Sequence, residues 1–145
     1  IFKFRKLKYG QLLYAGIVIV QCKFYICNMI KREILNRLTF FSTIYPVVTV
    51  TGLRQSGKTT LVKQAFPDYE YISLEDPDIR MIAINDPRKL IEGKGRRIII
   101  DEVQRVPDLF SYIQGMVDNP DFNGQYILTG SQNFLLLESI SQNVM

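Results

Sequence analysis

The chain has 145 residues, which is enough for one domain with a hydrophobic core. Its composition, 47% hydrophobic and 22% charged, is typical of a globular protein and excludes a disordered one. The chain contains no histidine, which excludes serine–histidine–aspartate catalysis and every zinc site that needs an imidazole. Two cysteines are too few for a four-cysteine zinc site or a disulfide framework, and they favour a reducing compartment. We therefore expect a cytoplasmic protein.

The net charge of +4 comes from the N-terminal end of the chain. Residues 1–28 contain five of the 18 basic residues and no acidic residue. Residues 29–145 contain the other 13 basic residues and all 14 acidic residues, a balance of −1. Because this larger part has no basic helix, it gives no strong signal for nucleic-acid binding.

The first 28 residues also differ from the rest in hydrophobicity. A basic stretch precedes an apolar run from Leu12 to Val20. The uncharged segment around this run is too short for a membrane span, which needs about 20 residues. Three interpretations stay open: an extension that is not part of the functional protein, a membrane-contacting or signal segment, and an extra strand or helix packed on the domain. The absence of acidic residues and the start at Ile1 favour the first, with Met29 as a candidate start.

From Met29 onward, segments with helical spacing of apolar residues alternate with short apolar or β-branched runs. The predicted helices are residues 30–40, 58–65, 78–84 and 87–92, and a segment that follows Pro107 and ends near Val117. The predicted strands are residues 47–51, 69–74, 97–100 and 125–129. Strands that alternate with helices in this way predict an α/β fold with a parallel sheet.

The strongest motif is Gly-Leu-Arg-Gln-Ser-Gly-Lys-Thr at residues 52–59, which matches the phosphate-binding pattern GxxxxGK[ST] at every position. Its glycines let the loop curl so that backbone N–H groups face a phosphate, and the following helix adds its positive N-terminal end. Lys58 can then reach the β- and γ-phosphates, and the Thr59 hydroxyl can coordinate Mg²⁺. The expected ligands are ATP and Mg²⁺. The predicted binding residues are Gly52, Arg54, Gln55, Ser56, Gly57, Lys58, Thr59 and Thr60.

A second motif lies at the end of the strand 97–100, where two adjacent carboxylates follow three isoleucines. Parallel sheets bind their ligands at the carboxyl ends of their strands. We expect Asp101 to hold Mg²⁺, directly or through water, and Glu102 to act as the general base for the water that attacks the γ-phosphate. A solvated acidic pair at a strand end is the structural alternative.

A third motif follows the strand 125–129, which ends in Thr129, Gly130 and Ser131. Hydroxyl groups at this edge could bond the γ-phosphate or the attacking water, although Thr-Gly-Ser is also common in turns. We expect Ser131, or alternatively Thr129, to sense the phosphate. The predicted catalytic residues are Glu102, Lys58, Ser131 and Thr129.

The segments 52–60, 71–77, 101–107 and 128–132 together resemble a prokaryotic family of AAA-type ATPases in the AAA+ superfamily. Members of that family usually continue into a C-terminal domain of unknown function. The resemblance covers the chain from Met29 onward. It implies a P-loop NTPase of three α/β/α layers, in which the three motifs are Walker A, Walker B and the first sensor. The implied parallel sheet is of the additional-strand type, ordered 5-1-4-3-2.

The resemblance also implies parts that have no match in this sequence. No residue can be assigned to the fifth strand, the helical lid, the second sensor or an arginine finger. We therefore divide the chain into an extension, residues 1–28, and a partial ATPase core, residues 29–145, truncated at its C-terminus. An arginine finger can raise the rate about 10³-fold or more, so we expect slow hydrolysis by this chain alone.

The expected function is binding and hydrolysis of Mg-ATP, coupled to conformational change, with a homo-oligomer or a protein partner in the complete protein. A P-loop kinase is less favoured because Glu102 suits the activation of water. Two further alternatives are a nucleotide-gated switch with little turnover, which could be DNA-associated, and an inactive gene fragment.

Overall fold

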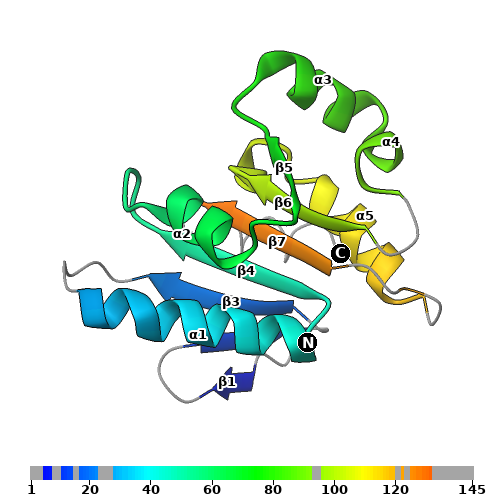
Figure 1. Cartoon of the computed structure of the whole chain (residues 1–145). Coiled ribbons are helices and arrows are strands. Elements are labelled where there is room, and N and C mark those ends of the chain that lie inside the picture. Colours follow the sequence, from blue (N-terminus) through cyan, green and yellow to red (C-terminus); the bar gives the residue numbers. More distant parts are fainter. Residues whose placement is uncertain are drawn as a thin grey trace.

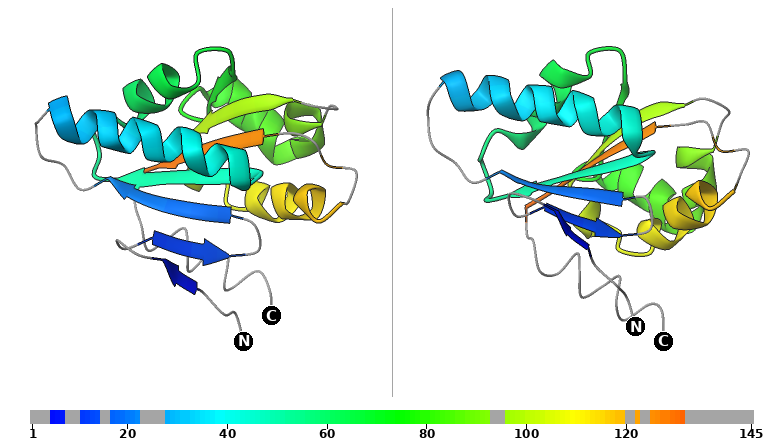
Figure 2. Two further views of the ribbon diagram at one scale, coloured as in Figure 1. Left: turned by 60° about the horizontal axis from the view of Figure 1, so that its bottom comes forward. Right: turned by 90° about the horizontal axis from the view of Figure 1, so that it is seen from below.

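The computed structural model describes residues 5–7, 11–14, 17–22, 28–92, 96–119, 122 and 125–131. Within these residues, helices pack on both faces of one sheet (Figure 1). Helices α1 (Asn28–Ile44) and α2 (Lys58–Ala65) cover one face of the sheet. Helices α3 (Pro77–Asn85), α4 (Pro87–Ile91) and α5 (Leu109–Val117) contribute to the core on the other face, and Figure 2 shows α1 and α5 on opposite sides. The three α/β/α layers are therefore confirmed.

The sheet has the strand order β1-β2-β3-β4-β7-β6-β5 among the described residues. Its strands are β1 (Arg5–Leu7), β2 (Gln11–Tyr14), β3 (Ile17–Cys22), β4 (Val47–Gly52), β5 (Glu70–Ser73), β6 (Arg97–Asp101) and β7 (Gln125–Gly130). The five strands from β3 to β5 in this order are parallel, and β1 and β2 are antiparallel. Strand β7 lies between β4, which leads into the P-loop, and β6, which ends in Asp101. This inserted strand is the additional strand that the resemblance implies.

The N-terminal strand β3 lies on the free side of β4, opposite β7. Its register runs from Ile17 beside Val47 to Cys22 beside Gly52. It therefore occupies the edge at which the order 5-1-4-3-2 has its fifth strand. This is the arrangement of an extra strand packed on the domain, the third of the interpretations above. Whether residues 1–28 belong to the functional protein stays a prediction.

The two cores follow from the alternation of side chains along the buried strands. On the face of α1 and α2, Val48, Val50, Ile99 and Ile127 pack together. The side chains on the opposite face include Val47, Ile98, Ile100, Tyr126 and Leu128. Because both faces are covered, these strands are apolar at nearly every position, as the sequence predicts.

Proline and aspartate set the boundaries of the helices. Asp76 and Asp86 each accept a hydrogen bond from a backbone N–H in the first turn of α3 and α4, at 2.9 and 3.3 Å, and each is followed by proline. Helix α1 runs to Ile44, beyond the predicted end at residue 40, because the first residue that cannot continue it is Pro46. The 3₁₀ helix η1 (Val103–Arg105) was not predicted.

Candidate functional site

The P-loop connects β4 to α2 by a tight turn in which the Ser56 N–H donates to the Leu53 carbonyl oxygen at 3.2 Å. Gly57, the residue before α2, has φ 77°. Left-handed backbone is costly for residues with a Cβ atom, which explains glycine at this position. Gln55 also has a positive φ, 59°. The loop therefore has the curled backbone that phosphate binding requires.

Lys58 turns its ammonium group back into the loop that precedes it. Its Nζ donates to the carbonyl oxygens of Leu53 at 2.7 Å and Gly52 at 3.2 Å, and to Ser56 Oγ at 3.4 Å. The residue is only 5% exposed. A buried ammonium needs such acceptors, and here the loop itself supplies them. An anion held by the loop would therefore meet a cation that is already in place.

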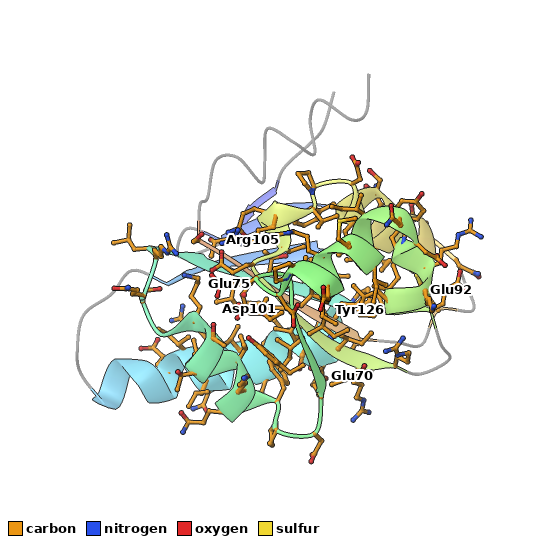
Figure 3. All side chains as sticks on the ribbon, turned by 90° about the horizontal axis from the view of Figure 1, so that it is seen from above. Glu70, Glu75, Glu92, Asp101, Arg105 and Tyr126 are labelled. Carbon is orange, nitrogen blue, oxygen red and sulfur yellow. The ribbon has the colours of Figure 1, made fainter. Side chains whose placement is uncertain are left out.

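Asp101 lies at the centre of the site and accepts hydrogen bonds from three hydroxyl groups. Thr59 Oγ1 and the Tyr71 hydroxyl donate to Oδ2 at 2.9 and 2.6 Å, and Thr129 Oγ1 donates to Oδ1. The donors come from α2, β5 and β7, so three elements converge on one carboxylate that is 6% exposed. Figure 3 shows Asp101 among the side chains at this edge of the sheet.

Tyr71 is a member of this cluster that the sequence analysis did not assign. Burial raises the pKa of its hydroxyl, and the hydrogen bond to Asp101 and the charge of that carboxylate raise the pKa further. The hydroxyl is therefore a proton donor at neutral pH. The ammonium of Lys63 lies 3.5 Å from the centre of the tyrosine ring. The pairing of Ser73 with Asp101 in the β5–β6 ladder is what brings Tyr71 within reach.

Glu102 leaves β6 with φ 57°, and its N–H donates to Thr129 Oγ1 at 3.3 Å. Its Oε2 accepts hydrogen bonds from Ser131 Oγ at 3.1 Å and from Gln104 Nε2. Gln104 Nε2 also donates to Ser131 Oγ at 2.7 Å. The structure thus brings Glu102, Thr129 and Ser131 together, and it adds Gln104, which the sequence analysis did not assign.

The remaining predicted residues lie around this cluster. Gly52, at the start of the loop, and Ser56, inside the loop, are both buried. Arg54, Gln55 and Thr60 are exposed. Glu75 and Arg105, both labelled in Figure 3, follow β5 and β6 and form an ion pair of 3.5 Å at the same edge of the sheet.

The side chains at this edge fit Mg²⁺ bound together with a nucleotide. Mg²⁺ is usually held by one or two carboxylates together with waters and the phosphate oxygens of a substrate. Asp101 supplies a carboxylate oxygen and Thr59 adds a hydroxyl oxygen, and the two are joined by a 2.9 Å hydrogen bond. In the described part of the chain, no group of three or more acidic, cysteine or histidine side chains could hold a metal alone.

Comparison with known families agrees with this geometry. A family model described as AAA domain matches residues 45–145, more than half of the chain. The chain belongs to the AAA domain family. The AAA domain is thus a nucleotide-binding module of the ATPase type, and the predicted membership of an AAA-type ATPase family is confirmed.

Two mycobacterial proteins are relatives of this AAA domain. They are the uncharacterized proteins Mb2031c of Mycobacterium bovis and Rv2008c of Mycobacterium tuberculosis. Each is 38% identical over 109 residues, which cover 72% of this chain and 24% of the relative. The matched region is therefore about a quarter of the length of these relatives. No solved structure matches the chain significantly. Among the described residues, no helix is long and apolar enough to cross a bilayer.

Proposed function

We propose that this AAA domain binds ATP with Mg²⁺ at the P-loop and hydrolyses it to ADP and phosphate. The observation that carries the proposal is the 2.9 Å hydrogen bond from Thr59 Oγ1 to Asp101 Oδ2. This bond joins the helix after the P-loop to the strand that ends in the acidic pair. The two oxygens that would face one cation are therefore held together at the phosphate-binding loop. Bound Mg²⁺ would neutralise charge on the phosphates as the reaction proceeds.

The other residues of the cluster have roles in the same proposal. The loop N–H groups and Lys58 hold the phosphates. The carboxylate of Glu102 takes a proton from water while the water oxygen bonds to the γ-phosphorus and the bond to the ADP oxygen breaks. Ser131, or alternatively Thr129, would bond the γ-phosphate; the proposal is supported by their contacts with Glu102, whose Oε2 accepts from Ser131 Oγ and whose N–H donates to Thr129 Oγ1.

The test of ATP binding is Lys58→Ala in the full protein. Without the ammonium group, the affinity for Mg-ATP should fall by about two orders of magnitude, because charge-assisted hydrogen bonds to phosphate are lost. Titration calorimetry measures the dissociation constant. Lys89→Ala, a matched substitution of an exposed lysine on α4, should leave it unchanged. Equal affinities for the Lys58→Ala and wild-type proteins would contradict the proposal.

A nucleotide-gated switch with little turnover is the second candidate. It is favoured by one observation: Glu102 Oε2 already accepts two hydrogen bonds from within the chain. Glu102→Gln separates the two functions, because it removes the base and leaves the phosphate site intact. An ATPase should keep Mg-ATP binding and lose at least about 100-fold in kcat. If the full protein hydrolyses ATP equally slowly with either residue, the switch is the better description.

A further inference from the structure

The side-chain amide of Gln104 lies between two of the proposed functional groups. Its Nε2 donates to Ser131 Oγ at 2.7 Å and to Glu102 Oε2. An amide nitrogen carries two hydrogens, so it can make both bonds at once. We infer that Gln104 is a positioning residue that couples the phosphate-sensing hydroxyl of Ser131 to the general base Glu102. This inference rests on the proposed function.

The backbone holds Gln104 in this place. Arg105 N–H donates to the Glu102 carbonyl oxygen at 3.0 Å, and Val106 N–H donates to that of Val103 at 3.1 Å, which closes the 3₁₀ turn. Val103, the first residue of the turn, and Val106, which follows it, are both buried in the core. A short turn anchored in this way lets Glu102 and Gln104, which are two residues apart in the chain, both contact Ser131 after the end of β7.

The orientation of the amide follows from the charge of Glu102. Among the described residues, Gln104 Oε1 is buried and has no hydrogen-bond partner. A buried carbonyl oxygen without a donor costs about 1–3 kcal/mol. Rotating the amide by 180° would place this oxygen against the carboxylate and lose a charge-assisted bond. The contact with Glu102 therefore selects the observed orientation, although it leaves the other end of the amide unpaired.

The coupling follows from counting protons. The hydroxyl of Ser131 has one proton, which it donates to Glu102 Oε2 at 3.1 Å, while its oxygen accepts from Gln104. If the Ser131 hydroxyl donates to a γ-phosphate instead, Oε2 loses one of its two hydrogen bonds. Oε2 then has room to accept a hydrogen bond from the attacking water, and the carboxylate stays oriented by Gln104 alone. In this way, occupancy by the γ-phosphate activates the base.

The first experiment is Gln104→Met in the full protein, which keeps the length of the side chain and removes both donors. We expect kcat for Mg-ATP hydrolysis to fall about 10- to 100-fold. The dissociation constants of Mg-ADP and of a non-hydrolysable ATP analogue should stay within about twofold of wild type, since the Gln104 amide nitrogen donates to Glu102 and Ser131, which lie outside the P-loop. Gln114→Met, a matched change on α5, should alter none of these values.

A double-mutant cycle with Ser131→Ala separates coupling from independent roles. If Gln104 acts through Ser131 and Glu102, the combined variant should lose about as much kcat as the more impaired single variant. A combined loss equal to the product of the two single losses would overturn the inference. If Gln104→Met does not fold, Gln104→Asn serves the same cycle, because its amide is one methylene too short to reach both partners.

The proposed function and the role of Gln104 are contradicted by different results. If the wild-type protein neither binds nor hydrolyses Mg-ATP, the proposed function is wrong and the coupling is wrong with it. If the wild type is active and Gln104→Met keeps its full kcat, only the inference about Gln104 is wrong. A parallel loss of nucleotide affinity in Gln104→Met would also contradict it, because that result indicates a structural role.

Discussion

At the scale of single residues, the stability of the site depends on how one buried charge is satisfied. Burying a carboxylate is expensive unless hydrogen bonds replace the water that it loses. Asp101 receives such bonds from Thr59, Tyr71 and Thr129. Two of these donors belong to the motifs, and Tyr71 does not. The tyrosine is therefore the donor whose removal tests the site without altering a motif.

Tyr71→Phe should lower the free energy of unfolding by about 1–2 kcal/mol at pH 7, because Asp101 loses one of its donors. Urea denaturation without nucleotide measures the change. Tyr112→Phe, at an exposed tyrosine of α5, is the matched control and should have little effect. An unchanged midpoint and slope for Tyr71→Phe would show that the hydrogen bond contributes nothing to stability.

The same variant makes a prediction about alkaline pH. Burial raises the pKa of Tyr71 in the folded chain above 10.0, its usual value and the value expected in the unfolded chain. At a pH between the unfolded and the folded pKa, the folded chain therefore keeps a proton that the unfolded chain releases. The contribution to stability is therefore complete below pH 10 and decreases as the pH rises above it, by about 1.4 kcal/mol per pH unit for one proton. Wild-type stability should fall more steeply above pH 10 than that of Tyr71→Phe. Parallel curves would contradict this.

Residue types in motifs were predictable, and contacts between motifs were not. The pattern around the P-loop predicts Lys58 and Thr59, and a strand that ends in two acids predicts Asp101. The places of Tyr71 and Gln104 depend on which strands are neighbours and on a 3₁₀ turn after β6. The order of the strands has no local sequence signal, because it is decided by packing over the whole sheet. The 3₁₀ turn was not predicted from the sequence either.

At the scale of elements, β4 shows how a strand covered on both faces constrains its side chains. All six of its residues are buried, yet it carries Thr49 and Thr51. Among the described residues, neither hydroxyl has a hydrogen-bond partner. The alternation of the strand places both on the face of Val47, opposite Val48 and Val50.

Thr49→Val should therefore raise the free energy of unfolding by about 1 kcal/mol, because a methyl group of similar size replaces an unpaired buried hydroxyl. Denaturant unfolding measures the change. Val48→Thr is the matched reverse substitution on the other face of the same strand, and it should lower stability by burying a new hydroxyl among Val50, Ile99 and Ile127. Destabilisation by Thr49→Val would indicate that the Thr49 hydroxyl has a partner.

At the scale of the whole molecule, the described strands form one sheet across the boundary at residue 28. Strand β3 adds a parallel strand to β4, and α1 packs over both. Strands β1 and β2 continue the sheet outward from β3. The composition of residues 1–28 predicts an independent extension, whereas their pairing predicts that they protect the edge of the strand that leads into the P-loop.

Deletion of residues 1–28 distinguishes these predictions. Without β3, the N–H and C=O groups along one edge of β4 lose their partners over residues 47–52, and an unpaired edge invites association with other chains. We expect the shortened protein to aggregate more readily, to unfold at lower denaturant concentration, and to bind Mg-ATP more weakly, since β4 positions the loop. Light scattering, urea denaturation and nucleotide titration of both proteins provide the comparison.

If the shortened protein matches the longer one in all three measurements, residues 1–28 are an extension that the AAA domain does not require. Loss of solubility with retained nucleotide affinity in the monomeric fraction would assign β3 to edge protection alone, because the loop would then be positioned by β7 and the two cores.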